Sequence, residues 1–418
     1  MLSIDFIRAN KERVRDTAEH KNRPFDIDKL LLLDDARKEL SEKVQRLREK
    51  RNEVAKQGNN EDARKEGVEI KDVLKKLEAE LDPIEKEFNT LMLFVPNVVL
   101  DEVPVGKDAS GNEVIKTWGT IRDFTFKPKS HVELAESLQL IDMERGSKVS
   151  GFRGYFLLNE LAVLQMALMH YVFLKLVAKG YTPIIPPTVV KEFTLFGSAH
   201  FPWGRAEDVY QLNQDEDSFL AGTAEIPVTA FYSNETLQEE DLPKKFVAMS
   251  PCYRREAGTY GKDTRGILRV HEFWKIEQVI IAQNDMEAAK KLHLELQENT
   301  EEIFRDLELP YHVLLMCTGD MGEPQMLKYD TEVWIPSENT YREVASNSIM
   351  GDFQARRLKI RYKNKSGETA YCYTLNDTAL ASTRPLIAIL ENNQQEDGSV
   401  IVPKVLQSLA GFDTIKPH

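Results

Sequence analysis

Cysteine is scarce in this 418-residue chain, and its three cysteines lie far apart at Cys252, Cys317 and Cys372. No two of them form a CxxC pair and none lies in a cluster with histidine. The sequence therefore argues against a disulfide framework and against a structural zinc site. We expect a protein of the reducing cytoplasm that binds no zinc.

Long apolar runs are also rare. The N-terminal segment, MLSIDFIRANKERVRD, lacks the apolar core of a signal peptide. The most apolar stretch, Leu161 to Ala178, is interrupted by Gln165, His170 and Lys175. We interpret it as a core or subunit-interface helix, and we expect no membrane partner.

An excess of positive charge is absent as well, because 55 basic side chains stand against 68 acidic ones and the net charge is -13. This balance excludes a general attraction to nucleic acid, so any such contact requires a local basic patch. The hydrophobic content of 42% is that of an ordinary globular protein, and the length is sufficient for two domains.

The N-terminal domain, residues 1–100, shows a heptad pattern over about residues 30–95. The apolar residues of its second helix, alternately four and three apart, are Ile70, Leu74, Leu77, Leu81, Ile84, Phe88, Leu91 and Val95. Gly58-Asn59-Asn60 separates the two helices, so we expect an antiparallel coiled-coil arm. Pro83 departs from the pattern, since proline tends to kink a helix.

The first arm helix is locally basic. Between Arg37 and Lys56 it holds eight basic residues against four acidic ones. On a protein of net negative charge, this surplus favours a polyanion partner. The alternative is a solvated helix face with charge pairs four residues apart, and the residues alone leave both open.

Residues 101–129 are rich in turn formers, and we interpret them as a linker. In residues 130–418 long helices alternate with short strand patterns at hairpin spacing, which predicts an α+β domain whose antiparallel sheet is flanked by helices. The expected helices cover residues 155–179, 285–305 and 385–395. The expected strands cover residues 183–190, 246–254, 267–281, 329–335, 341–345 and 370–375.

One hairpin of this domain, Ala248 to Gln278, has charged side chains where a buried strand should be apolar. In its second strand, alternation places on one face Arg269, His271, Phe273, Lys275 and Glu277. Arginines suit phosphate oxygens and an aromatic ring suits a base, so this face can form the floor of a nucleotide site. The alternative is a half-solvated sheet with one wet face.

Three further clusters bring related chemistry. They are Gly222 to Glu225, Tyr341 to Ser346 and Leu375 to Arg384. Singly, Thr223 could be a helix cap, Glu343 a surface carboxylate and Arg384 an ion-pair partner. Together they indicate a nucleotide site in which Glu343 and Ser346 supply oxygen ligands for magnesium. No GxxxxGK[ST] or GxGxxG motif accompanies them, which argues against a P-loop or Rossmann site.

Three segments match the motifs of a known family in content and order. They are Gly180-Tyr181-Thr182-Pro183 to Pro187, Cys252-Tyr253-Arg254-Arg255-Glu256 through Glu277, and Ala379 to Arg384 with Ile389 to Asn392. With these segments, with PNVVLDEVPVG and with Thr223-Ala224-Glu225, the chain resembles bacterial-type seryl-tRNA synthetase along its whole length. The resemblance implies a class II antiparallel sheet flanked by helices, with an N-terminal coiled-coil arm.

The resemblance also implies an ATP site. Its residues would be Arg254, Arg255, Glu256, Arg269, Val270, Phe273, Glu343, Val344, Ala345, Ser346 and Arg384. Arg254 would hold the α-phosphate and the serine carboxylate, Glu256 the adenine amino group, and Phe273 would stack on adenine.

The remaining residues would act at the outer phosphates of ATP. Arg269 and Arg384 would clamp them, and Glu343 and Ser346 would bind the Mg2+ that accompanies ATP. Arg254, Glu343 and Arg384 are the catalytic residues that the resemblance implies.

For serine, the resemblance implies a pocket made of Thr223, Ala224, Glu225, Arg254, Glu277, Asn376 and Thr378. The reaction would be activation of L-serine by ATP and transfer of serine to the 3' end of tRNA(Ser), with tRNA(Sec) as a further partner. Arg46, Arg48 and Arg51 of the arm would contact tRNA, and the enzyme would be a homodimer.

Some residues depart from the family pattern. Asn376-Asp377-Thr378 stands where Asn-Gly-Ser is usual, which adds bulk and charge near the serine pocket, and Val344 to Met350 replaces a segment rich in serine and cysteine. The residues argue against two other functions. A ligase that loads a carrier protein is expected to lack the long arm, and a non-catalytic coiled-coil protein would not need intact Arg254, Glu256, Glu343 and Arg384.

Overall fold

The structure, a computed structural model, describes residues 1–56, 61–204, 208–213, 215–256 and 265–417. It divides into two compact units, Met1–Val98 and Val99–His418. The expected turn at Gly58-Asn59-Asn60 lies outside the described residues. So does most of the loop from Ala257 to Gly266, for which we expect mobility until ATP or the tRNA end arrives.

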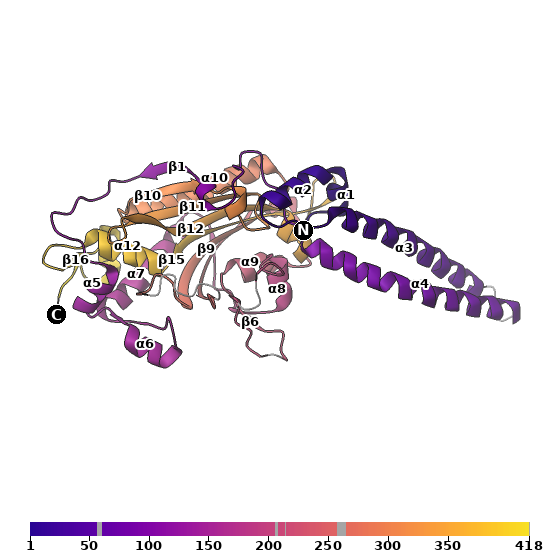
Figure 1. Cartoon of the computed structure of the whole chain (residues 1–418), viewed down its shortest axis with the longest axis horizontal. Coiled ribbons are helices and arrows are strands. Elements are labelled where there is room, and N and C mark those ends of the chain that lie inside the picture. The colour runs from indigo at the N-terminus through magenta and orange to yellow at the C-terminus, as the bar shows by residue number, and fades with distance from the viewer. Residues whose placement is uncertain (57–60, 205–207, 214, 257–264, 418) are drawn as a thin grey trace. The chain divides into compact units, whose positions relative to one another are not determined.

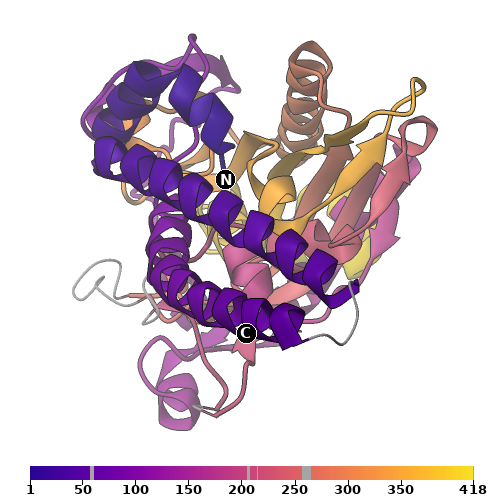
Figure 2. The same ribbon diagram turned by 90° about the vertical axis from the view of Figure 1, so that its right-hand side faces the viewer.

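The first unit is helical, and its two long helices form the expected arm. Its elements are α1 (Ile4–Ala9), α2 (Lys11–His20), α3 (Ile27–Lys56) and α4 (Glu61–Leu93). Figure 1 and Figure 2 show α3 and α4 side by side. Val44, Val54, Ile70 and Leu74 form the buried seam between them, which confirms the heptad pattern. Pro83 lies inside α4, and the helix continues on both sides of it.

The base of the arm is held by a buried carboxylate on α3. Asp34 receives hydrogen bonds from Arg8 on α1 at 2.9 Å and from Arg37 at 2.8 Å, and Lys38 forms an ion pair with it at 2.8 Å. Burial would raise the pKa of Asp34, but these three cations outweigh it and lower the pKa to about 2. Asp34 therefore stays ionised and ties α1 to α3.

The second unit is built on one large sheet. Among the described residues, eight strands pair in the order β1-β10-β11-β12-β15-β9-β8-β4. Their bounds are β1 (Glu113–Trp118), β10 (Tyr311–Leu315), β11 (Leu327–Ile335), β12 (Thr340–Gly351), β15 (Tyr373–Ala381), β9 (Glu272–Ala282), β8 (Lys244–Tyr253) and β4 (Thr182–Ile184). All neighbours are antiparallel except β4 and β8, which run parallel. This confirms the α+β class and its antiparallel core.

Shorter strands and helices surround this sheet. The strands are β2 (Ile141–Asp142), β3 (Phe156–Leu157), β5 (Val189–Val190), β6 (Phe219–Leu220), β7 (Thr236–Gln238), β13 (Arg361–Lys363), β14 (Thr369–Tyr371), β16 (Val400–Ile401) and β17 (Thr414–Ile415). The helices are α5 (His131–Ser137), α6 (Met143–Ser150), α7 (Asn159–Ala178), α8 (Glu192–Gly197), α9 (Glu225–Thr229), α10 (Met286–Asp306), α11 (Phe353–Leu358), α12 (Thr383–Asn393) and α13 (Lys404–Ala410).

Several predicted boundaries are corrected. The proposed linker contains β1, an edge strand paired with β10, because its alternating EVIKTW is hidden between turn-rich flanks. The strand expected at 267–281 begins only at Glu272, since residues 265–271 follow turns and bends. The strand expected at 183–190 is two short strands in different sheets, and the one expected at 370–375 is split between β14 and β15.

Helices α7 and α10 pack against the large sheet (Figure 1). Lys175 of α7 pairs with Asp306 of α10 at 2.5 Å. By length and composition α7 could cross a bilayer, a test that a helix packed in a protein core also passes. Seven of its residues are buried, and Leu164, Leu168 and Val172 belong to the main core.

The Asp34 cluster gives a stability prediction. Asp34→Ala should lower the stability of the α1–α3 contact by about 2 kcal/mol, because it removes the anion shared by three cations. Asp35→Ala is the matched control, since Asp35 also contacts Arg8 but is exposed, and it should cost at most about 0.5 kcal/mol. Amide hydrogen exchange of α1 and of the start of α3 measures both. Equal protection in the two variants would contradict this role of Asp34.

Candidate active site

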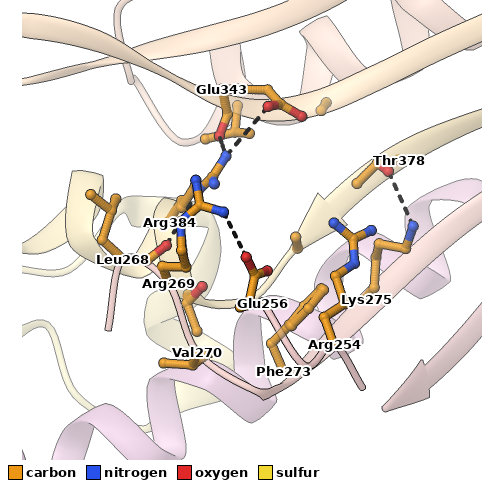
Figure 3. Close-up of a pocket in the computed structure, with 14 residues that line it drawn as sticks. Arg254, Glu256, Leu268, Arg269, Val270, Phe273, Lys275, Glu343, Thr378 and Arg384 are labelled. Atoms are coloured by element: carbon orange, nitrogen blue, oxygen red, sulfur yellow. Dashed lines mark hydrogen bonds and ion pairs between the residues drawn. The ribbon is translucent and has the colours of Figure 1, made fainter. Parts of the chain in front are cut away.

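A pocket opens on the large sheet where β8, β9, β12 and β15 lie together (Figure 3). Its volume is about 200 Å³. The lining includes Arg254, Glu256, Leu268, Arg269, Val270, Phe273, Lys275, Glu343, Val344, Ala345, Thr378, Ala381, Thr383 and Arg384. Nine residues predicted for the ATP site and two predicted for the serine site, with Arg254 in both sets, are thus brought to one place, although the chain segments that carry them are far apart in sequence.

Three guanidinium groups converge on this pocket. Arg254 follows β8, and its Nε donates to the carbonyl of Gly222 at 3.3 Å while its guanidinium lies 5.4 Å from the centre of the Phe273 ring. Arg269 donates to the Glu256 carboxylate at 2.6 Å. Arg384, near the start of α12, donates to the backbone oxygen of Glu343 at 2.6 Å. Such forks suit the oxygens of a polyphosphate.

Glu343 lies opposite these arginines, as Figure 3 shows. The surrounding protein partly desolvates its carboxylate, but the positive charges of Arg384, Lys328, Arg254 and Arg269 outweigh this and hold the pKa below its usual range. Glu343 is therefore ionised at neutral pH. Its side chain is half-exposed, so its oxygens are accessible to a ligand.

Oxygen atoms that could hold a magnesium ion surround Glu343. Ser346 of the same strand hydrogen-bonds to Asp330, which pairs with Lys328 at 2.9 Å. Burial and the nearby Glu343 raise the pKa of Asp330 to about 6, against the opposing effect of Lys328. Oδ1 of Asp330 is buried and has no hydrogen-bond partner among the described residues. This set of oxygen donors fits a hard divalent cation.

A second set of polar side chains is buried beside the pocket, around Lys275. Lys275 is 4% exposed and lies 2.5 Å from Glu277, 2.6 Å from the Thr223 hydroxyl and 3.4 Å from the Thr378 hydroxyl. Glu277 also accepts from Asn376 at 3.3 Å. The predicted serine-site residues Thr223, Glu277, Asn376 and Thr378 therefore form one hydrogen-bonded cluster.

Glu225 completes this cluster with an unusual charge state. It opens α9, where Gln354 of α11 donates to it at 2.8 Å. Burial, together with the negative charge of Glu277, raises the pKa of Glu225 to about 7, against the lowering effects of Gln354, Lys275 and Arg254. Near neutral pH this carboxyl group is therefore poised between its two protonation states and can ionise when a cation arrives.

Some predicted residues lie elsewhere. Arg255 lies over the Tyr210 ring, 6.0 Å from its centre, and does not line the pocket. His271 was expected on the face of Phe273, but it bonds to the Arg254 carbonyl at 2.9 Å and contacts Tyr210, because the strand has not yet begun there. Ala224 packs in a small apolar cluster with Val228 and Phe246.

The added charge at Asp377 does not face the predicted serine pocket. Its carboxyl group lies on the opposite face of the sheet, where Thr300 of α10 donates to it at 2.7 Å and Gln278 at 3.1 Å. Burial raises its pKa well above the usual range. Asn347 also faces α10, donating to the His293 carbonyl at 2.9 Å. The side chain of Asp377 therefore adds no bulk to the face of β15 that carries Asn376 and Thr378, although the charges of Glu277 and Lys275 act on its pKa.

Three further members of the site received no role from the residue patterns. Lys275 had a usable signal, because it alternates with Phe273 and Glu277 on the predicted polar face. Lys328 had none, since it reaches the site only through the pairing of β11 with β12. Gln354 lies in the segment from Asp352 to Arg357, which also resembles the family, but its contact with Glu225 arises only from the packing of α11.

Comparison with known proteins gives a consistent assignment. Residues 1–99 match the seryl-tRNA synthetase N-terminal domain, and residues 209–393 match the class II tRNA synthetase core domain (G, H, P, S and T). The Serine--tRNA ligase of Deinococcus radiodurans is 42% identical over 417 residues, covering 98% of each chain.

Solved structures agree with these matches. The seryl-tRNA synthetase of Pyrococcus horikoshii complexed with ATP is 38% identical, with a TM-score of 0.92 and complete coverage of both chains. The cytoplasmic serine-tRNA ligase of Naegleria fowleri in complex with AMP is 31% identical with a TM-score of 0.86, covering 99% of this chain and 97% of that one.

The buried Lys275–Glu277 pair predicts a large effect on stability. Lys275→Met should lower the free energy of unfolding by about 3 kcal/mol, because the Glu277 carboxylate is left buried without its cation. Adding Glu277→Gln should restore part of this loss. Urea unfolding measures both variants.

Lys244→Met is the control on the neighbouring strand. Lys244 pairs with Asp241 at 3.4 Å in a more exposed position, so its loss should cost at most about 1 kcal/mol. A Lys275→Met protein as stable as the Lys244→Met protein would contradict this account of the pair.

Proposed function

The chain belongs to the seryl-tRNA synthetase family, and on that premise we propose how its residues divide the reaction. The enzyme is a serine--tRNA ligase: it activates L-serine with ATP to seryl-adenylate and transfers serine to tRNA. The full-length similarity, arm included, favours this function over a carrier-protein ligase or a non-catalytic coiled-coil protein. The observation that carries the proposal is the convergence of three arginines beside a buried, acid-rich pocket.

In the activation step, the serine carboxylate attacks the α-phosphorus of ATP. A bond forms between a carboxylate oxygen and phosphorus, the bond to the bridging oxygen breaks, and pyrophosphate leaves. The nucleophile is already ionised, so no general base is needed. Because anions must be brought together, Arg254 supports the reaction at the α-phosphate and the carboxylate, with Arg269 and Arg384 at the outer phosphates.

The adenine ring is bound by Phe273 and Glu256. Phe273 offers a ring face on the pocket wall, and Glu256 is held by Arg269 so that a carboxylate oxygen can accept from the adenine amino group. Val270, Val344 and Ala345 complete the walls. Magnesium, held by Glu343 and Ser346, would neutralise phosphate charge when bound with ATP.

Serine is recognised by the Lys275 cluster. Glu225 and Glu277 provide negative charge for the serine ammonium, while Thr223, Asn376 and Thr378 provide hydrogen bonds within reach of its hydroxyl. A site of this kind rejects alanine and glycine because its buried polar groups are left unpaired when the hydroxyl is missing. Lys275 keeps these groups in place through its contacts with Thr223 and Glu277.

The arm is proposed to bind tRNA(Ser), and tRNA(Sec) as a second substrate, through phosphate contacts. Arg46 is 78% exposed and only loosely paired with Glu42 at 3.5 Å, and Arg51 is exposed too. Arg48 instead pairs with Glu78 across the hairpin at 2.8 Å. Some cations therefore pair on the arm, while others remain accessible to a polyanion.

Two copies of the chain are proposed to form a homodimer in the cytoplasm through the face of α7 that the core leaves uncovered. Val163, Met166 and Leu174 are exposed there, and Met166 is 59% exposed. Apolar residues of this size on one helix are typical of a subunit interface. Sedimentation of the intact protein tests this assembly, and a monomer at micromolar concentration would exclude it.

Serine use should depend on pH through Glu225. The pKa of about 7 for this carboxyl group means that at lower pH binding of the serine ammonium must first release a proton. The KM for serine in pyrophosphate exchange should therefore rise by about tenfold per pH unit well below pH 7 and become flat above it. The KM for ATP is the internal control. A serine KM that stays constant from about pH 5.5 to about pH 8, a range that spans the pKa of Glu225, would contradict this role.

Charge reversal on the arm tests the proposed tRNA contacts. Arg46→Glu combined with Arg51→Glu should weaken tRNA binding and reduce the slope of log affinity against log salt by roughly two, while pyrophosphate exchange stays unchanged. Lys365→Glu combined with Lys404→Glu changes the net charge equally at exposed positions outside the arm and should have little effect. Loss of exchange in parallel with tRNA binding would contradict this division of labour.

A further inference from the structure

Two buried oxygen atoms on the α10 side of the large sheet have no hydrogen-bond donor among the described residues. They are Oδ1 of Asp377 on β15 and Oδ1 of Asn347 on β12. The two residues are directly opposite each other in the antiparallel pairing of these strands, and both side chains bond to α10. Opposed side chains on one face of an antiparallel pair lie within reach of each other. Since both side chains are almost completely buried, two unpaired oxygens here would be costly.

The contacts of Asn347 fix which of its amide atoms is the unpaired one. Its Nδ2 donates to the His293 carbonyl at 2.9 Å and to Oε1 of Gln297 at 3.3 Å. Because a backbone carbonyl only accepts hydrogen bonds, the amide atom beside it must be the nitrogen. Both amide hydrogens are then used, and Oδ1 of Asn347 remains an acceptor that needs a donor.

The side-chain donors that reach Asp377 within the described part of the chain both go to its other oxygen. Thr300 donates to Oδ2 at 2.7 Å and Gln278 donates to Oδ2 at 3.1 Å. An ionised carboxylate is an acceptor only, so it would place two acceptor oxygens, one from Asp377 and one from Asn347, against each other. A protonated carboxyl group carries one donor, which is what this pair of oxygens requires.

Burial of Asp377 favours the form that carries this proton. The enclosed position raises the pKa of Asp377 well above the usual range, although the hydrogen bond from Thr300 opposes this. The negative charges of Glu277 on β9 and Asp330 on β11 also raise the pKa, whereas Lys275 on β9 lowers it. Burial prevails because it disfavours the charged form directly.

The titratable groups on the other side of Asp377 bring little positive charge. His293 of α10 is neutral at physiological pH, because burial lowers its pKa to about 4. Tyr181, which precedes β4, is neutral as well, because burial raises its pKa. It donates to Glu295 of α10, and Lys245 pairs with that carboxylate at 2.7 Å, so these two charges offset each other.

We propose that Asp377 holds a proton on Oδ1 at neutral pH and donates it to Oδ1 of Asn347, and that this bond positions its neighbours Asn376 and Thr378 for serine. Asn376 and Thr378 both bond to Glu277 on the opposite face of the sheet. Asp377 and Asn347 lie in the two segments that depart from the family pattern, so the two departures compensate each other. The positioning role rests on the function proposed above, whereas the proton and its bond do not.

Asp377→Asn tests the proton. The asparagine amide can donate to Asn347 and accept from Thr300 and Gln278 without a proton that depends on pH. Above about pH 4 the unfolded chain loses the Asp377 proton while the folded protein keeps it. The unfolding constant of the unmodified protein should therefore rise relative to that of Asp377→Asn by about tenfold per pH unit, up to the pKa that Asp377 has in the folded protein. Urea unfolding from about pH 5 to about pH 8 measures this ratio.

Asp397→Asn is the matched control. Asp397 is exposed, and the hydrogen bond from Ser399 lowers its pKa, so it is ionised in both states over this range and its ratio should not change with pH. Infrared spectra give a second measurement. The C=O band of a protonated carboxyl group should remain at neutral pH when the Asp377→Asn spectrum is subtracted from that of the unmodified protein, and not when the Asp397→Asn spectrum is subtracted. A constant ratio and no such band would overturn the assignment, as for an ionised Asp377 bridged to Asn347 by a cation or a water molecule.

Asp377→Ala tests the positioning of the serine-site residues. At one fixed neutral pH, the KM for serine in pyrophosphate exchange should rise about fivefold, the loss expected for one hydrogen bond. The KM for ATP should stay within about twofold, and Asp377→Asn should restore the serine KM. Asn347→Ala should act like Asp377→Ala, and the double variant should add little, because both changes remove the same bond.

These outcomes separate the pair from the function on which its role rests. An unchanged serine KM in both Asp377→Ala and Asn347→Ala would overturn the positioning role. An ATP KM that rises in parallel would overturn it too, because the effect would then extend beyond serine. Absence of serine-dependent exchange in the unmodified enzyme would instead reject the proposed function, while the unfolding and infrared results would still decide whether Asp377 holds its proton.

Discussion

The site depends on one buried ion pair in the middle of the sheet. Lys275 and Glu277 lie two residues apart on β9, so they share a face, and their charged atoms are 2.5 Å apart with almost no exposure. Two charges can remain this deep only when each is satisfied by the other and by hydrogen bonds. Thr223 from the segment before α9 and Thr378 from β15 provide those bonds. The pair therefore fixes the relative positions of three chain segments that form the proposed serine pocket.

Because side chains alternate between the two faces of a strand, the residues of the proposed site and the residues that support them lie on opposite faces of β15. On β15, Asn376 and Thr378 face the Lys275–Glu277 pair, whereas Asp377 between them points to α10 and is held by Thr300 and Gln278. The polar network on the α10 side of the sheet thus holds β15 in the register in which Asn376 and Thr378 face the pocket. Since both faces of β15 carry polar groups, a shift by one residue would leave buried groups of both faces unpaired.

The sequence predicts those features of this enzyme that depend on patterns of residues close together in the chain. The heptads of the arm, the antiparallel α+β domain and the side-chain alternation from Phe273 to Glu277 follow from periodicity alone. Features that arise from pairing between distant segments were not predictable in this way. The edge strand Glu113–Trp118 finds its partner only through β10, and Gln354 reaches Glu225 only through the packing of α11. The orientation of Asp377 depends on the register between β15 and β9.

We propose that the Lys275–Glu277 face selects serine and presents it to ATP. Amino-acid-dependent pyrophosphate exchange, run in parallel with serine, threonine, alanine, glycine and cysteine, tests it most directly. We expect efficient exchange with serine and kcat/KM values lower by roughly 10⁴ for alanine and glycine, since these amino acids leave the polar groups of the pocket unpaired. Exchange with alanine or glycine at a rate similar to that with serine would contradict it.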